Sequence, residues 1–316
     1  MKRQGKGWRI ASGLLLSGLL AFATPTKTPV PGTLNYLEGQ ATIDGKLLNS
    51  TSMGGEVVGP GQILNTQAGG KVEMLLTPGV FLRLGENSEA RMVSSGLADL
   101  EVALDRGQAT VEADYWMKDN RLLIDQNGAR TDILKKGLYV LSAEQPYVQV
   151  LDGKVELSAN DQHISVGKNR EAFVDPSGKL KTQDFNKDAV QEGALVRWSK
   201  LRSEYEAQAN FDAARTVIVN NGWYGPGWYW GPSFGYWSFL PADGILYSPF
   251  GWGFYSPYYV YGGPYFYGGY RGYYGRPLYP RTGVVAPRPG VVAPRAGVVA
   301  PHSFAGGGLA AGGRHR

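Results

Sequence analysis

The side chains of this chain that are best suited to recognition are aromatic, and they gather in one stretch. Of the 38 Phe, Trp and Tyr residues, 24 lie between Trp223 and Tyr279, interleaved with Gly and Pro. Each ring offers about 150 to 250 Å² for burial, so it should pack on the protein or meet a flat partner. Such partners are a sugar ring, a membrane interface and another copy of the segment. The predicted ligand contacts are Trp223, Tyr224, Trp228, Tyr229, Trp230, Trp237 and Trp252.

Residues that could perform catalysis are sparse. His302 and His315 lie near the end of the chain, and His163 has only Asp161 nearby, which is too few ligands for a metal site. No phosphate-binding or dinucleotide-binding glycine motif is present. Asp132 and Glu144 are carboxylate candidates only by default, and solvated strand or turn charges explain them better. We therefore predict no enzyme activity, no catalytic residues, no metal and no cofactor.

Charge is unevenly distributed along the 316 residues. Residues 1–23 carry a net charge of +4, residues 24–222 carry −5, and the remainder carries +6. The basic isoelectric point thus reflects the two ends. The arginines after Trp223 are widely spaced, whereas a nucleic-acid footprint needs clustered cations on a folded face, so no nucleic-acid partner is expected. The chain has no Cys, which excludes disulfides and thiolate metal sites.

The first 23 residues have the pattern of a signal peptide. A basic start precedes an apolar run over 10–23 that ends in Ala21-Phe22-Ala23, a small-x-small cleavage pattern. The alternative is an uncleaved membrane anchor, but 14 residues fall short of the roughly 20 that span a bilayer. We expect cleavage after Ala23 and an exported protein that is periplasmic, outer-membrane associated or secreted.

Short strands separated by turns are predicted over 33–180. Val72, Met74 and Leu76 alternate with other residues, and the period of two resumes after Thr77-Pro78-Gly79, as expected of a hairpin or a solenoid corner. The same spacing recurs around Asp105-Arg106-Gly107 and Asp152-Gly153. Turns at such short intervals indicate an all-β sandwich, barrel or β-solenoid.

Five of these strand and turn segments follow one another in a recognisable order: 61–66 (GQILNT), 69–74 (GGKVEM), 82–88 (LRLGENS), 150–157 (VLDGKVEL) and 164–167 (ISVG). Together they resemble the FecR domain, the family named after the ferric-citrate sensor of bacterial envelopes. Gly137-Leu138 departs from the Gly-Thr that the family often has before a strand. The resemblance covers about residues 33–175 and implies an all-β, β-helix or solenoid-like envelope domain without catalytic residues.

In the namesake, this domain relays a signal inward to a sigma factor through a membrane span and a cytoplasmic part. Only nine residues precede the apolar run here, so we do not expect that relay to transfer to this chain. The resemblance then implies an exported β-domain that binds a glycan or another envelope component.

An amphipathic helix is predicted after the strands, from about Lys187 to Ala209, with Asn186 as N-cap. Ala194, Leu195, Trp198, Leu201 and Tyr205 form an apolar stripe at helical spacing, which we expect to dock on the rest of the protein. Lys200 with Glu204 and Arg202 with Glu206 are predicted as i, i+4 ion pairs on the opposite face.

The predicted organisation has six parts. They are a signal peptide over 1–23, a linker over 24–32, the FecR-like β-domain over 33–180, the helix over 181–215, a Gly/aromatic segment over 222–280 and a Pro/Arg tail over 281–316. The tail holds three heptads that begin GVVAP, typical of an extended spacer.

Two functions from different classes remain open. The first is a non-enzymatic envelope module whose partner is a cell-envelope polysaccharide or peptidoglycan, with membrane-surface contact as a further option. The second is a structural surface or matrix protein in which the aromatic-Gly segment self-associates.

Overall fold

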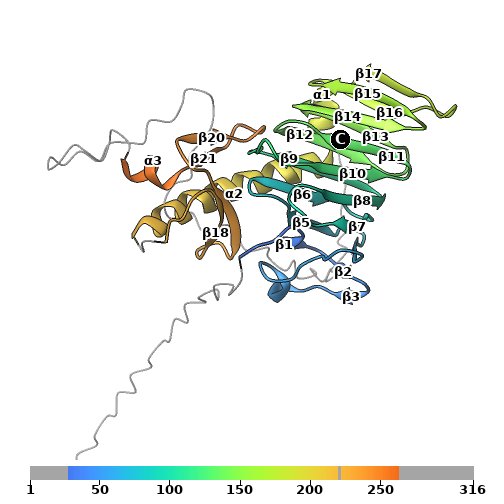
Figure 1. The fold of residues 1–316 in the computed structure, drawn as a ribbon. Helices are drawn as coiled ribbons and strands as arrows, with labels where there is room; N and C mark the ends of the chain where they lie inside the picture. The colour runs from blue at the N-terminus through green and yellow to red at the C-terminus, as the bar shows by residue number, and fades with distance from the viewer. Residues whose placement is uncertain (1–27, 220–221, 263–316) are drawn as a thin grey trace, which may run out of the picture. The chain divides into compact units, whose positions relative to one another are not determined.

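The computed structural model describes residues 28–219 and 222–262, all of them in one compact unit within residues 1–275. The described chain is mostly β-strand, arranged in two large sheets and two short hairpins, with three α-helices (Figure 1). The predicted all-β class with a helix after the strands is therefore confirmed. The signal peptide with Ala21 and Ala23, and the Pro/Arg tail, lie outside the described residues.

The larger strands form two sheets, which we call sheet A and sheet B. Sheet A has the order β1-β5-β6-β9-β12-β13-β16-β17, and its strands span Thr33–Glu38, Lys71–Leu75, Val80–Leu84, Gln108–Ala113, Gly137–Ser142, Tyr147–Asp152, Arg170–Val174 and Leu180–Asp184. Sheet B has the order β15-β14-β11-β10-β8-β7-β4-β2-β3. In chain order its strands span Ala41–Ile43, Lys46–Leu47, Ile63–Thr66, Glu89–Ser94, Leu100–Arg106, Leu122–Gln126, Ala129–Ile133, Lys154–Ala159 and Gln162–Gly167.

The chain alternates between the two sheets and advances along both in sequence order, except that β3 lies outside β2 at the edge of sheet B (Figure 1). This stepwise advance is the solenoid-like feature of the fold, although nearly all neighbouring strands are antiparallel and only β8 and β10 pair in parallel. Thr77-Pro78-Gly79 closes the hairpin between β5 and β6 within sheet A. Gly107 and Gly153, in contrast, stand at corners where the chain crosses from one sheet to the other.

The two corner glycines have positive φ angles, +79° at Gly107 and +97° at Gly153. A Cβ at Gly107 would lie 2.1 Å from the Ser88 hydroxyl, and one at Gly153 would lie 2.0 Å from the Tyr139 hydroxyl. Both the backbone conformation and the lack of space therefore require glycine here.

The main core lies between the sheets. Strand alternation turns Val72, Leu82 and Val111 of sheet A inward, toward Val102 and Ile124 of sheet B, and all five are buried in one cluster. The same alternation turns the intervening residues of β5, β6 and β9 to the outer face of sheet A, which holds the candidate site.

Two helices follow the strands. The first, α1, spans Lys187–Gln191, and the Asn186 side chain accepts a hydrogen bond from the Ala189 amide, so the predicted N-cap is present. Helix α2 spans Ala194–Val219, and a short 3-10 turn, η1, lies far upstream at Ser50–Ser52. The single predicted helix is therefore two helices, separated at Gly193, and the second ends at Val219 rather than near Ala209.

The aromatic segment is folded over residues 227–262. Strands β18 and β19, Gly227–Gly231 and Tyr236–Leu240, form one hairpin, and β20 and β21, Ile245–Tyr247 and Gly253–Tyr255, form the other. Helix α3 follows at Pro257–Gly262. The strands are short because Gly and Pro interrupt them, and both hairpins pack against α2 (Figure 1).

Candidate functional site

The outer face of sheet A carries charged side chains that are fully buried. Glu73 on β5 lies directly opposite Arg83 on β6, and Glu112 follows on β9. Arg83 donates to Glu73 over 2.7 Å through Nε and to Glu112 through Nη1. Charged residues at alternate strand positions normally face water, so another element must cover this face.

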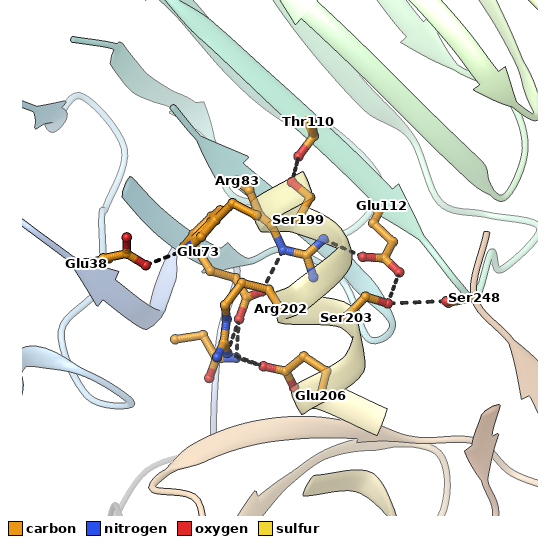
Figure 2. Close-up of polar contacts among 12 residues, drawn as sticks. Glu38, Glu73, Arg83, Thr110, Glu112, Ser199, Arg202, Ser203, Glu206 and Ser248 are labelled. Carbon is orange, nitrogen blue, oxygen red and sulfur yellow. Dashed lines mark hydrogen bonds and ion pairs between the residues drawn. The ribbon is translucent and has the colours of Figure 1, made fainter. Parts of the chain in front are cut away.

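Helix α2 is that element, and it covers the sheet with a polar face. Arg202 Nη2 donates to Glu73 Oε1 over 2.9 Å and to Glu206 Oε1 over 2.7 Å (Figure 2). The Ser203 hydroxyl donates to Glu112 over 2.6 Å, and Ser199 lies 2.8 Å from the Thr110 hydroxyl. We call the charged members of this cluster the buried ionic network: Glu73, Arg83, Glu112, Arg202 and Glu206.

The network corrects the prediction for α2. Arg202 and Glu206 do form the expected i, i+4 pair, but they lie on the docked face at 1% and 0% exposure, whereas Leu201 of the predicted apolar stripe is 45% exposed. The reason is that the surface beneath the helix carries Glu73, Arg83 and Glu112, and only polar residues can satisfy those charges. Leu195 and Trp198 are buried as predicted.

Asn35 connects the buried ionic network to the hairpin of β18 and β19. A register shift in β1 leaves Asn35 between the paired residues Leu34 and Tyr36, which is a bulge that redirects its side chain. Its amide nitrogen lies 3.0 Å from Glu73 and 2.9 Å from Glu206, and its oxygen accepts from the Trp237 amide over 2.9 Å. The carbonyl of Trp237 lies 3.0 Å from the same amide nitrogen.

Aromatic rings enclose the central cation of the network. The Arg202 guanidinium carbon lies 3.9 Å from the ring centroid of Tyr36 and 4.6 Å from that of Tyr236, a favourable cation–π arrangement. Tyr36 comes from β1 and Tyr236 from β19, so one arginine touches both the β-domain and the hairpin. The Tyr236 hydroxyl donates to the Tyr205 carbonyl over 3.0 Å.

The carboxyl groups of the network differ in their titration. Burial alone would raise the pKa of Glu73, but the charges of Arg202 and Arg83 hold it well below its usual range. Burial and the nearby charge of Glu73 raise the pKa of Glu206 well above its usual range. Burial and the charge of Glu112 do the same for the pKa of Asp114. Folding therefore strengthens proton binding by Glu206 and Asp114.

The seven predicted contact residues do not form one surface. Side chains of β18 alternate, so Trp228 and Trp230 point to one face of the hairpin and Tyr229 to the other. Trp228 is 7% exposed and packs edge-on against Phe81 of sheet A, with ring centroids 5.2 Å apart. Trp237 is equally buried, contacts the Trp230 ring at 5.4 Å and donates through its indole nitrogen to the Gly54 carbonyl.

Of the remaining predicted residues, Trp223, Tyr224 and Trp252 lie nearer the surface than Tyr229. Tyr229, itself buried, stacks with Trp223 at 5.3 Å and with Tyr224 at 5.6 Å, each with an angle of 28° between ring planes. Tyr224 is 87% exposed, and Trp223 and Trp252 are partly buried. We call Trp223, Tyr224 and Tyr229 the aromatic stack. It brings together three of the seven predicted residues.

The residues considered for catalysis are dispersed. His163 lies 3.7 Å from Glu156 on an exposed strand face, and Glu144 accepts hydrogen bonds from the Gly107 amide and the Ser142 hydroxyl. Burial raises the pKa of Asp132. Within residues 28–219 and 222–262, no three His, Asp or Glu side chains are arranged to hold a metal ion. None of the helices in those ranges combines the length and apolarity needed to cross a bilayer.

Comparisons with known proteins leave the family open. No family model matches the sequence, and no curated protein matches it. Two crystal structures of a "putative anti-sigma factor" from Parabacteroides distasonis are similar to it at 16% and 17% identity, with TM-scores of 0.36 and 0.37. Each match covers 41% of this chain and 62%, less than two thirds, of the other. A likeness this distant carries no argument about function.

Proposed function

We propose that the chain is an exported, non-enzymatic protein of the cell envelope, and that the described unit is a binding module for an envelope glycan. The signal-peptide pattern and the FecR-like segments support the location. The aromatic stack supports the binding role, because it holds the exposed Tyr224 ring in a fixed position against the buried Tyr229 ring.

The stack is positioned by contacts that do not involve a ligand. The Tyr229 hydroxyl donates to the Gly225 carbonyl over 2.8 Å and accepts from the Tyr224 amide over 3.3 Å. Tyr258 of α3 meets the Trp223 ring edge-on at 6.2 Å, and below them lie Ala213 and Leu240. Because the rings are ordered before binding, a sugar face that packs on Tyr224 costs little additional entropy.

Self-association is the second candidate, and a specific observation favours it. Tyr247, Tyr258 and Tyr259 are also exposed on the aromatic segment, as is Phe211 of α2. Exposed rings of this number suit a second copy as well as a sugar. The two candidates differ in whether the protein assembles without any ligand.

The test is co-sedimentation of the full chain with peptidoglycan, with envelope polysaccharide, with lipid vesicles and alone. Tyr224→Ala removes the most exposed ring of the stack, and Tyr247→Ala is the matched control because it removes an exposed tyrosine of another hairpin. We expect Tyr224→Ala to weaken glycan binding about 2- to 10-fold, the worth of one aromatic contact. Equal binding by wild type, Tyr224→Ala and Tyr247→Ala would contradict the proposal, and sedimentation without ligand would establish the second candidate.

A further inference from the structure

A separate cavity of about 500 Å³ opens beside α1 and α2. Its apolar lining comes from four places in the chain: Leu138 of β12, Leu151 of β13, Val196 of α2, and Phe250 between β20 and β21. The first three are buried and Phe250 is partly buried. The volume falls within the roughly 300 to 1,000 Å³ of small-molecule sites.

Cationic side chains dominate the polar lining. Four cations line the cavity with only two carboxylates: Lys168, Lys187, Arg197 and Lys200 with Asp152 and Glu192. Lys168 pairs with Asp152 over 2.8 Å and Arg197 with Glu192 over 3.8 Å. Among residues 28–219 and 222–262 the structure shows no ion pair for Lys187 or for Lys200, although the sequence predicted one between Lys200 and Glu204.

This excess of positive charge differs from its surroundings. Residues 24–222 carry a net charge of −5, so acidic side chains outnumber basic ones in this part of the chain. At the cavity the basic side chains outnumber the acidic ones. Lys187 and Lys200, on neighbouring helices, take part in no ion pair of the described residues, although the charge of Lys200 acts on Glu204. An anion placed near both lysines would lower the electrostatic energy.

We propose that this cavity binds an anionic amphiphile, a single-chain molecule with a phosphate or carboxylate group on an apolar body. The anionic group contacts Lys187, Arg197 and Lys200 at the rim, and the apolar body packs on Leu151 and Phe250. The site shares no residue with the aromatic stack, so the two proposals succeed or fail independently.

The test measures binding of monomeric octyl phosphate to the full chain by calorimetry. Octyl glucoside tests the apolar body alone, inorganic phosphate tests the charge alone, and vesicles with anionic lipid test a membrane surface. The variant Lys187→Gln with Lys200→Gln removes the two unpaired charges. Lys118→Gln is the matched control, because Lys118 is exposed and does not line the cavity.

We expect octyl phosphate to bind more tightly than either partial probe, and more weakly at high salt. The double variant should lose about 3- to 10-fold in affinity for octyl phosphate, while Lys118→Gln loses none. Phe250→Ala should weaken octyl phosphate and octyl glucoside alike. Equal affinity for octyl phosphate and octyl glucoside, equal affinity of the double variant and wild type, or binding to vesicles alone would each overturn the proposal.

Discussion

At the scale of single residues, Arg202 joins its own helix to strands β1, β5 and β19. It binds Glu73 of sheet A and Glu206 of its own helix, and it lies against Tyr36 and Tyr236. A buried ion pair adds little net stability over apolar residues of the same shape, but loss of one partner leaves a buried charge uncompensated. The network therefore acts mainly to specify how the helix and the hairpin dock.

Replacing Arg202 should be strongly destabilising for this reason. We expect Arg202→Met to lower the free energy of unfolding by about 3–5 kcal/mol, because buried Glu73 would keep only Arg83 as its cation and buried Glu206 would lose its hydrogen bond from Arg202. Chemical denaturation followed by circular dichroism measures this change in the free energy of unfolding. Arg215→Met, at an exposed position of the same helix, should change the stability by less than about 0.5 kcal/mol. A loss below about 1 kcal/mol for Arg202→Met would refute a central role for this residue.

Glu206 should make the stability depend on pH. Its pKa is raised by burial and by Glu73, so the folded state binds the proton more tightly than the unfolded state. The stabilisation is therefore complete below the unfolded value of 4.5 and declines as the pH rises toward the folded pKa. Asp114 contributes in the same direction, whereas the lowered pKa of Glu73 acts oppositely and only at acidic pH.

Glu206→Gln removes one of these titrations and keeps the side-chain shape. Thermal midpoints measured from pH 5 to pH 9 should decline less steeply for Glu206→Gln than for wild type. Glu192→Gln, at an exposed position where α1 ends, should follow the wild-type curve. Parallel curves for wild type and Glu206→Gln would show that the folded protein does not hold this proton.

At the scale of elements, α2 joins the β-domain to both aromatic hairpins. Asn210 shows how: its amide nitrogen donates to the Phe239 carbonyl over 2.8 Å and to the Tyr255 carbonyl over 3.1 Å, and its oxygen accepts from the Tyr255 amide. Ser238 donates to the Glu206 carbonyl over 2.7 Å. A single helix face thus serves as the hydrogen-bonding partner for β19 and β21.

Loss of Asn210 should loosen the hairpins more than the sheets. We expect Asn210→Ala to lower the free energy of unfolding by about 2–3 kcal/mol, because several buried hydrogen bonds are lost at once. Limited proteolysis should then cut within residues 222–262 before the β-domain. Gln208→Ala, at a partly buried position of the same helix, provides the comparison. First cleavage within the β-domain would contradict this picture.

The strands were largely predictable from the sequence, while the site was not. Alternation and glycine turns indicated β5, β6, β13 and β14 because a period of two is a local property. The roles of Glu73 and Arg202 depend on two segments 129 residues apart meeting, and each alone reads as a solvated charge. A usable signal was the spacing of Ser199, Arg202, Ser203, Glu206 and Asn210, which places small and polar residues on one helix face.

At the scale of the whole described unit, residues 227–262 of the aromatic segment are part of the fold. Trp228, Phe239 and Phe254 form one buried cluster with Leu75 and Phe81 on the outer face of sheet A. Composition alone left open whether this segment folds, because Gly and Pro at such density also occur in disordered chains. The segment folds because sheet A offers an apolar surface on which it packs. That surface cannot be inferred from the sequence of the segment alone.

The most direct test of this account is hydrogen exchange of the backbone amides in residues 227–255 of the full chain. The Trp237 amide donates to Asn35 and the Tyr255 amide to Asn210, both in buried or partly buried surroundings. We predict that these amides exchange at least about 100-fold more slowly than in an unstructured chain, and that Arg202→Met removes most of this protection. Exchange at the rate of an unstructured chain in the wild-type protein would contradict the claim that residues 227–255 are a fixed part of the fold.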